Sequence, residues 1–265
     1  FVVGLLGWRW AFFIPAFIVI LLGIHWAVRG RNAPEEVGLP TVEEQEKGKY
    51  VGKIRKDDHL GFAYTLNKIL KNPGIWIAAF SLFFLNIVRY GFIDWAPTYL
   101  FEVQKAAIST AAFKALLIPV AGSFGAIFAA WASTRFFNLR KAPVAVIMLL
   151  TLGITAFIFP YLPVENWFLG LIALVVIGFM TYGPHVMIVT AMPMDLGTRK
   201  ATSSVTGFID GMGYMGAAFA GVSSGWLIDN FSWHAAFYFW VAAAFAAAIL
   251  MAFLWKKKPA IGKYH

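Results

Sequence analysis

The 265-residue sequence contains no cysteine and few charged residues, which make up 13% of the chain. Without cysteine, the chain has neither disulfides nor thiolate metal sites. A soluble domain carries roughly 25% charged residues, whereas 60% of the residues here are hydrophobic and the mean hydropathy is +0.71. This composition predicts an integral membrane protein whose main surroundings are a lipid bilayer.

The sequence also lacks the motifs of several other function classes. Its net charge is +9, but the basic residues cluster in a few loops and form no face interleaved with aromatic residues. We therefore expect no nucleic-acid partner. No Gly-rich stretch follows a strand and ends in Lys-Ser/Thr, and there is no His-Glu-x-x-His pattern or dense ligand cluster. These absences predict no enzyme activity, no cofactor and no metal site.

Long apolar runs divide the chain. A membrane-spanning helix needs about 20 largely apolar residues. Seven segments meet this criterion, namely 8–28, 74–100, 108–133, 142–162, 166–191, 201–228 and 233–255. The segment from Arg29 to Leu70 is polar and carries both signs of charge. It is predicted to be a linker between two helical bundles, with a surface helix around Phe62–Leu70.

Lysine and arginine gather on one side of these predicted spans. That side receives the long linker, the turn at 135–141, the turn at 199–200 and the C-terminal tail, whereas the other side has only Arg9 and Lys105. Loops rich in lysine and arginine stay in the cytoplasm. The pattern therefore predicts a multi-pass protein whose linker and C-terminus are cytoplasmic.

An internal similarity predicts how the spans are grouped. The stretch 7–13 resembles the stretch 232–238, and both precede an inward-running span. If they are equivalent positions of two parallel repeats, the chain is all-α and is one complete six-helix half plus the last helix of a preceding half. The four predicted parts are a helix at 1–28, a cytoplasmic linker at 29–72, a six-helix bundle at 73–255 and a basic tail at 256–265. Because the chain begins at Phe1 without methionine, we expect it to be a fragment.

Two charged residues, Arg89 and Asp94, lie inside the apolar segment 74–100. A charge near the bilayer centre costs at least ~2.5 kcal/mol, so each must face a protein interior or a watery cavity. The planar fork of an arginine can bind a phosphate through two hydrogen bonds. The alternative is a structural ion pair with Asp94 or with another helix. Five residues turn a helix by about 140°, so pairing with Asp94 would need a local distortion at Gly91.

The segment 89–100, Arg-Tyr-Gly-Phe-Ile-Asp-Trp-Ala-Pro-Thr-Tyr-Leu, resembles the seventh helix of bacterial glycerol-3-phosphate and hexose-phosphate transporters. The run 181–184 resembles their tenth helix, and 206–208 with 213–216 resembles their eleventh. These proteins are organophosphate:phosphate antiporters of the major facilitator superfamily, and the resemblance covers nearly the whole chain. It implies the C-terminal six-helix half of a major facilitator fold plus the last helix of the N-terminal half.

The same resemblance implies a function. It predicts a carrier of a bacterial inner membrane that exchanges an organic phosphate, either glycerol-3-phosphate or a sugar phosphate, for inorganic phosphate by alternating access. In that family one arginine comes from each half. Arg89 would be one of them, and its partner would lie in the missing N-terminal half of the same protein.

The chain departs from the family in three places. The eighth-helix stretch 119–122 lacks the acid that the family often has, and 133–135 lacks the aspartate of the superfamily's signature loop. Asp210 occupies a position where bacterial glycerol-phosphate carriers have no acid. Without that signature-loop aspartate, the usual gating charge pair of the superfamily is not expected here. Because of Asp210, the substrate can differ from that of the glycerol-phosphate carriers.

Three further charged residues are candidates for charge balance or coupling. Asp94 and Asp210 are expected to be charge partners rather than ligands, because a carboxylate repels phosphate. Asp210, near mid-membrane, can balance a cation, select a substrate hydroxyl or carry a proton. Lys114 either adds positive charge to the cavity or extends to the outer interface.

Five residues complete the candidate substrate site. His185 follows Gly183-Pro184 and can sense protonation, bind substrate or simply be satisfied by a neighbouring helix. The tyrosines can donate hydrogen bonds to phosphate or sugar hydroxyls, and Asn86, one turn before Arg89, can orient the guanidinium. The candidate substrate-binding residues are Arg89, Tyr90, Asn86, Tyr182, His185 and Tyr214.

Glycines at 207, 211, 221 and 225 have small-xxx-small spacing. This spacing predicts that these glycines allow close helix packing and gating motion rather than bind a ligand. Two other functions stay open from the sequence. One is a proton-coupled symporter for an organic anion such as a sugar acid, with Asp210 or His185 carrying the proton. The other is a transporter-like sugar-phosphate sensor.

Overall fold

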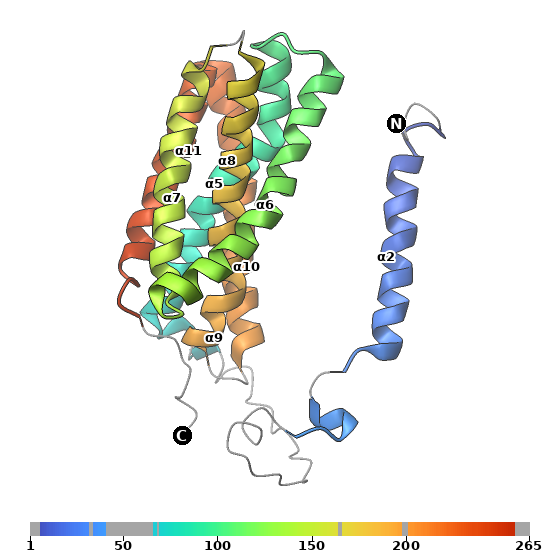
Figure 1. Cartoon of the computed structure of the whole chain (residues 1–265), viewed down its shortest axis with the longest axis vertical. Coiled ribbons are helices and arrows are strands. Elements are labelled where there is room, and N and C mark those ends of the chain that lie inside the picture. The colour runs from blue at the N-terminus through green and yellow to red at the C-terminus, as the bar shows by residue number, and fades with distance from the viewer. Residues whose placement is uncertain are drawn as a thin grey trace. The chain divides into compact units, whose positions relative to one another are not determined.

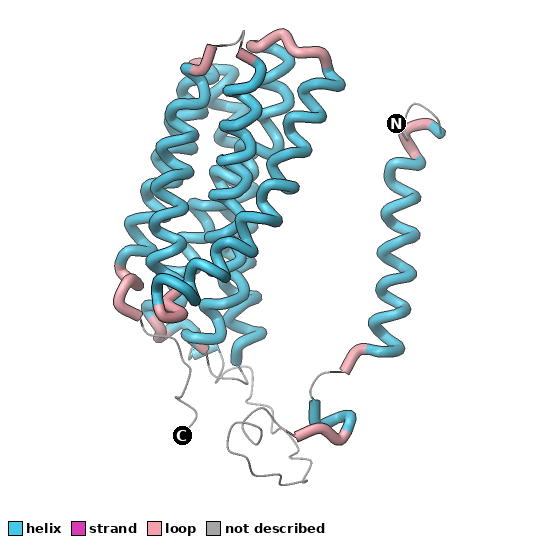
Figure 2. Tube along the Cα trace, viewed as in Figure 1, coloured by secondary structure: helices cyan, strands magenta, loops and turns pink. Residues whose placement is uncertain are grey.

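The computed structural model describes residues 6–31, 34–40, 66–67, 69–163, 166–197 and 201–257, and all of its regular elements in these ranges are helical (Figures 1 and 2). The chain divides into two compact units near residue 58. The first unit contains the 20-residue helix α2 (Trp10–Arg29) and the short 3-10 turn η1 (Pro34–Val37). None of the residues of α2 is buried, so this helix exposes an apolar surface on every side.

The second unit is a bundle of six long helices. In chain order they are α5 (Pro73–Glu102), α6 (Ile108–Phe137), α7 (Lys141–Ile158), α8 (Trp167–Val186), α10 (Thr202–Asn230) and α11 (Trp233–Ala252). A 3-10 turn, η2 (Phe159–Tyr161), continues α7, whereas a π-helical turn, η3 (Met187–Ala191), and α9 (Met192–Leu196) continue α8. Successive helices run in opposite directions, with α6 packed mainly on α8, and α10 on α5 (Figure 1). The end at which α5 and α7 begin is called the Lys141 end, and the opposite end the Trp167 end.

Local signals explain where several helices start. Asn72 precedes Pro73, and its side-chain oxygen accepts the Gly74 N–H at 3.0 Å. Asn166 caps α8 in the same way, and Ser232 caps α11. Such caps satisfy N–H groups that have no partner within the helix, and proline suits the first helical position because it lacks that N–H.

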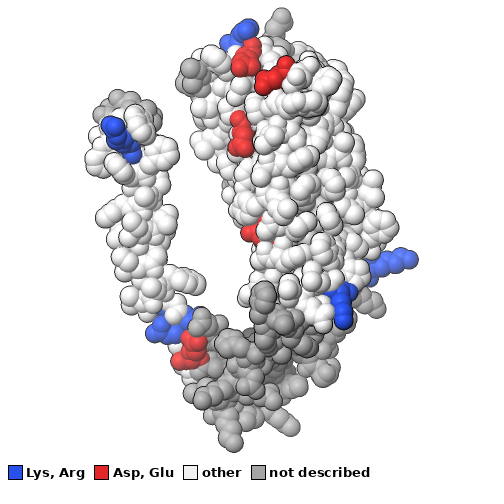
Figure 3. Space-filling view, turned by 180° about the vertical axis from the view of Figure 1, so that it is seen from behind, with Lys and Arg blue, Asp and Glu red and all other residues white. Residues whose placement is uncertain are grey.

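All seven segments that were predicted to be long helices are helical. Six of the described helices are long and apolar enough to cross a membrane. The exception is α10, which has sufficient length at 29 residues but is rich in glycine and serine. On the bundle face in Figure 3, the Lys and Arg side chains lie near the ends, with isolated acidic side chains between them. Of the predicted surface helix at 62–70, residues 66, 67, 69 and 70 are described and are helical, and the others lie outside the described residues.

Aromatic side chains fix how α5 sits against α11. Phe92, Phe237 and Trp240 form a buried cluster, in which the Phe92 and Trp240 ring centroids are 5.0 Å apart. The Trp240 indole lies against Gly91 so closely that a Cβ there would be 2.5 Å from a ring carbon. No larger residue than glycine fits here. Since Arg89 is two residues away, this contact also sets the rotation of α5 that orients the arginine.

Of the four glycines that sequence spacing indicated, Gly225 on α10 meets α5, where a Cβ would lie 3.2 Å from the Trp95 ring, and the other three do not contact another of the described helices. Within the described residues, nothing lies within 4 Å of a Cβ built on Gly207, Gly211 or Gly221. Close approach occurs instead at Gly216, against the Phe83 backbone, and at three further glycines between α6 and α8, namely Gly122, Gly125 and Gly178. Spacing alone identified glycine-rich faces but not which of them meets a neighbour, because that depends on the rotation of each helix.

Candidate functional site

Arg89 lies half-buried in the middle of α5 and contacts the tenth-helix candidate, His185. Its Nη1 is 2.9 Å from Nε2 of His185, across the α5–α8 contact. A residue of a neighbouring helix therefore forms a hydrogen bond with His185, which was one of the alternatives that the sequence left open for this histidine. No ion pair joins Arg89 to Asp94, and α5 is continuous through Gly91. The intrahelical pair that we considered for Arg89 is absent.

Two tyrosine rings flank the guanidinium. Its Cζ lies 4.6 Å from the ring centroid of Tyr182 and 5.3 Å from that of Tyr90. The negative faces of aromatic rings attract a cation. Gly122 on α6 lies directly against the Tyr182 ring and leaves no room for a Cβ, so it helps to hold that ring in place. Gly122 could not be assigned this role from the sequence, because the contact depends on α6 lying beside α8.

Three polar atoms at this site are buried without a hydrogen-bond partner in the structure. They are Nε of Arg89 and both side-chain polar atoms of Asn86, whose exposed fraction is 1%. Asn86 faces α10, where a Cβ on Gly213 would lie 2.9 Å from its Nδ2. More than 90% of buried polar groups in proteins are paired. This concentration of unpaired groups is unusual for a protein core and makes the surroundings of Arg89 the candidate site.

The backbone of α8 changes form directly after this site. Pro184 lies within the helix, and the π-helical turn Met187–Ala191 begins two residues after His185. Proline removes a helix hydrogen bond, and π turns occur frequently at functional sites. The sequence indicated a break at Gly183-Pro184, and the structure shows it as a change of helical pitch within a continuous span.

The other candidates lie around the site rather than in contact with Arg89. The Tyr214 ring on α10 has its centroid 6.4 Å from that of Tyr90, and the side chain is 55% exposed. Asp210 is one turn before Tyr214 and half-buried, and Asp94 is exposed on α5. Neither aspartate forms an ion pair with another described residue. The three lie at or near the surface of the bundle, where groups from outside this chain can reach them.

Lys114 is not part of this cluster. It is only 3% exposed, and its Nζ lies 5.7 Å from the ring centroid of Trp167, near the start of α8. The side chain thus extends toward the Trp167 end of the bundle. This is the direction expected for a lysine that reaches for the interface, although it does so between two helices.

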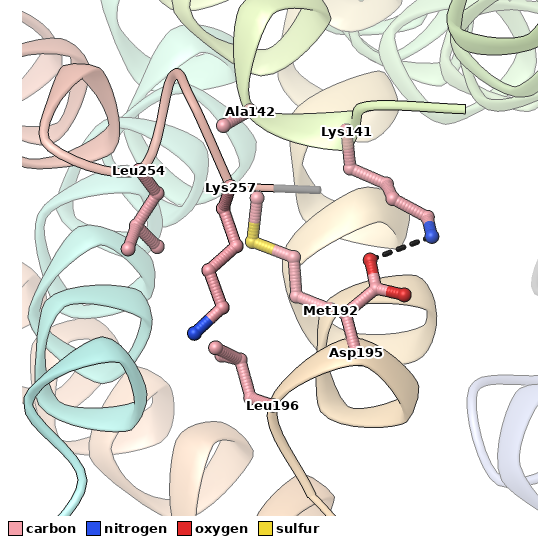
Figure 4. Close-up of a pocket in the computed structure, with 7 residues that line it drawn as sticks. All are labelled: Lys141, Ala142, Met192, Asp195, Leu196, Leu254 and Lys257. Atoms are coloured by element: carbon pink, nitrogen blue, oxygen red, sulfur yellow. Dashed lines mark hydrogen bonds and ion pairs between the residues drawn. The ribbon is translucent and has the colours of Figure 1, made fainter. Parts of the chain in front are cut away.

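A second polar cluster, at the Lys141 end, was not predicted from the sequence. Nζ of Lys141 is 2.6 Å from Oδ2 of Asp195, which joins the start of α7 to α9 (Figure 4). Beside it, Nδ2 of Asn72 donates to the Leu196 carbonyl at 3.1 Å. Lys257 lines the same small pocket from the C-terminal side. Lysine and aspartate are common in loops, so their pairing gave no sequence signal.

Comparison with known proteins places this geometry in a family context. The model of the Major Facilitator Superfamily matches residues 1–221. The chain is 32% identical to the glycerol-3-phosphate transporter of Bacillus subtilis, over 94% of this chain and 56% of that protein. It is 30% identical to a probable hexose phosphate transport protein of Chlamydia trachomatis, over 94% of this chain and 57% of that protein. The chain thus spans little more than half the length of these relatives.

A solved structure agrees on the fold. The crystal structure of the fucose:proton symporter of Escherichia coli matches 75% of this chain and 47% of its own, with a TM-score of 0.61 and 16% sequence identity. At that identity the match concerns architecture alone. It confirms the expected fold class, an all-α polytopic protein with a six-helix half of the major facilitator type.

Proposed function

Because the chain belongs to the Major Facilitator Superfamily, we propose that it forms the C-terminal half of a carrier that exchanges an organic phosphate for inorganic phosphate. The names of the two relatives, a glycerol-3-phosphate and a hexose phosphate transporter, support this substrate class. The observation that carries the proposal is Arg89. It is a half-buried cation in the middle of an apolar helix, and its hydrogen-bond partner in this chain is a neutral group rather than an acid.

The chemistry of this arrangement suits a dianion. The planar fork of the Arg89 guanidinium fits two phosphoryl oxygens. Tyr90 and Tyr182 flank the cation without neutralising it, so its charge remains available to a ligand. Tyr214 and Asn86 would bind the hydroxyls or oxygens of the same ligand. Asp94 and Asp210, at the bundle surface, would then balance positive charge supplied by the other half.

Exchange follows if the loaded carrier changes conformation and the empty carrier does not. In major facilitator proteins the two halves rock around a midplane site. A phosphate bound between Arg89 and a cation of the other half would stabilise the closed intermediate, and such differential stabilisation shifts the conformational equilibrium. The empty site would keep two like charges apart. This would make the return of the carrier depend on a second anion.

The organisation within the membrane forms part of the same proposal. Residues 1–28 would be the last helix of the preceding half and 29–72 the linker, followed by the bundle at 73–255 and the tail at 256–265. The Lys141 end would face the cytoplasm of a bacterial inner membrane, because Arg135, Arg140, Lys141 and Lys256 lie there. Access of a membrane-impermeant reagent to a single cysteine introduced at residue 140 tests this orientation.

Counterflow measures the exchange directly. The full-length carrier is reconstituted in vesicles loaded with unlabelled phosphate, and the uptake of labelled phosphate and of labelled glycerol-3-phosphate is followed. We expect Arg89→Lys to slow uptake about 10- to 100-fold. Lysine cannot donate two parallel hydrogen bonds to the phosphate, so the variant loses about one charge-assisted hydrogen bond. Arg135→Lys, at an exposed position of α6, is the matched control and should exchange normally.

The result also separates the rival functions. Normal exchange by Arg89→Lys contradicts the paired-contact proposal. Uptake that ignores internal phosphate but collapses with an uncoupler indicates a proton-coupled symporter. Binding of glycerol-3-phosphate without any flux indicates a sensor.

A further inference from the structure

The hydrogen bond between Arg89 and His185 determines the protonation state of the histidine. A guanidinium has five N–H donors and no acceptor. Across the 2.9 Å contact, Nε2 of His185 must therefore accept from Nη1 of Arg89. Because a protonated imidazole has no acceptor, the ring is neutral and carries its proton on Nδ1. In the absence of an anion, His185 acts as the acceptor for Arg89.

An anion that binds Arg89 competes with His185 for the hydrogen bond that Nη1 of Arg89 donates. Nε of Arg89 is buried, and the rings of Tyr90 and Tyr182 flank the guanidinium. The accessible part of the fork is its Nη1–Nη2 end. A paired grip on that end uses Nη1, so a phosphoryl oxygen competes with the Nε2 lone pair for the same nitrogen. Two acceptors that face each other without a proton between them are unfavourable.

We propose that His185 brings one proton into the site with each phosphate group that Arg89 binds, an inference that rests on the function proposed above. The proton comes from solvent and makes an imidazolium that donates to a phosphoryl oxygen, or it arrives on the monoanion as a P–OH that donates to Nε2. In both forms the loaded site holds one proton more than the empty site plus a phosphate dianion. The proton leaves with the anion on release. His185 thereby makes the carrier move phosphate as the singly charged species.

The other charged and titratable groups on the helices packed around His185 do not fill this role as well. Arg89 is itself the donor to the anion, and the tyrosine hydroxyls can donate without taking up a proton from solvent. On α6 and α7 the charged side chains lie toward the ends of the bundle. Asp210 on α10 is the alternative proton acceptor, and the experiment below distinguishes it from His185. The groups on these elements are Arg89, Tyr90, Asp94, Tyr99, Glu102, Tyr182, Lys114, Arg135, Lys141, Asp195, Asp210, Tyr214 and Asp229.

Proton uptake during binding tests the proposal. Titration calorimetry of the full-length carrier with glycerol-3-phosphate, in two buffers of different ionisation enthalpy at pH 8, gives the number of protons taken up. A phosphate ester is mainly a dianion there, since its second ionisation lies near pH 6. We expect about one proton per ligand, and a Kd that rises about tenfold for each pH unit above this value, as one-proton linkage requires.

The matched variants are His185→Gln and His234→Gln. A glutamine at residue 185 has both an acceptor oxygen for Arg89 and a donor nitrogen for the phosphate. The variant therefore needs no additional proton to bind the dianion. We expect it to bind with no proton uptake and a Kd independent of pH between 7.5 and 9. His234, which is exposed on α11, is the control, and its variant should retain the proton.

The outcomes are distinct. Wild-type binding without proton uptake overturns the proposal and leaves phosphate exchange standing. Uptake that persists in His185→Gln but disappears in Asp210→Asn assigns the proton to the aspartate and also overturns it. If glycerol-3-phosphate does not bind at all, or binds equally to Arg89→Lys, the failure belongs to the proposed function. If the glutamine variant does not fold, Asp210→Asn still decides between the two carriers, because its proton uptake should persist if His185 carries the proton and disappear if Asp210 does.

Discussion

The polar cluster in the middle of the bundle and the one at its Lys141 end are built in opposite ways. At the Lys141 end, the cation is paired with an acid at 2.6 Å, and the Asn72 side chain both donates and accepts a hydrogen bond. In the middle, Arg89 has a neutral imidazole as its side-chain hydrogen-bond partner. Its Nε and the whole amide of Asn86 are buried without partners.

The difference separates a cluster whose polar groups are paired from one whose polar groups lack partners among the described residues, as the proposed ligand site would require. Paired and satisfied groups hold α5, α7 and α9 together at the Lys141 end. An unsatisfied buried polar group costs about 1–3 kcal/mol, so the central cluster should lower the stability of the bundle. In the proposed function, a phosphate would supply an anion to the Nη1–Nη2 end of Arg89. We therefore expect mutations to change stability and exchange separately in the two regions.

Arg89→Met gives the largest expected effect. It should reduce phosphate exchange at least ~100-fold, because the site loses its cation. It should not lower the thermal unfolding midpoint of the purified full-length carrier, since a cation inside a membrane helix costs at least ~2.5 kcal/mol. Counterflow and a fluorescence melting curve on the same preparation measure both. A midpoint that falls by several degrees would show instead that Arg89 serves the fold.

Asp195→Asn should have the converse effect. It leaves Lys141 without its anion in a partly buried position, where the two side chains are 16% and 11% exposed. Breaking such a pair should cost about 1–3 kcal/mol of the unfolding free energy, between the values for surface and buried pairs. Exchange per folded carrier should stay within about twofold of the wild type, because the residue is remote from the phosphate site.

Asp229→Asn is the control for this loss. Asp229 is exposed near the Trp167 end of α10 and forms no ion pair among the described residues. Its variant should unfold at the wild-type midpoint. If the unfolding midpoint falls equally in both variants, the Lys141–Asp195 ion pair makes no specific contribution to the unfolding free energy.

The helices of this chain could be predicted from the sequence, and the contacts of its site could not. Apolar runs and local caps such as Asn72-Pro73 identify where each helix lies. They do not give its rotation, because residues that face lipid and residues that face the core are equally apolar, and the usual helical periodicity is weak. The rotation of α5 depends on the contact of Gly91 with Trp240, which is formed between distant segments.

The two polar pairs illustrate this limit. Arg89 and His185 were both candidates, but they lie 96 residues apart, and only the packing of α5 on α8 brings them together. Lys141 and Asp195 are 54 residues apart, and neither was a candidate site residue from the sequence. A buried charge identifies a site from the sequence, whereas its partner depends on tertiary structure.

Asn86→Leu gives the smallest expected effect and the sharpest contrast, because it should stabilise the protein. Leucine has the same branched arrangement of side-chain heavy atoms as asparagine, and it removes two buried polar atoms that lack partners among the described residues. We expect the unfolding free energy to rise by about 1–2 kcal/mol while exchange slows, since a leucine cannot form a hydrogen bond with the ligand. Ser81 is equally buried on α5, but it donates to the Ala247 carbonyl, so Ser81→Ala should bring no gain. If Asn86→Leu unfolds more easily than the wild type, Asn86 has a partner that stabilises the empty bundle. The central cluster would then be held together in the same way as the one at the Lys141 end.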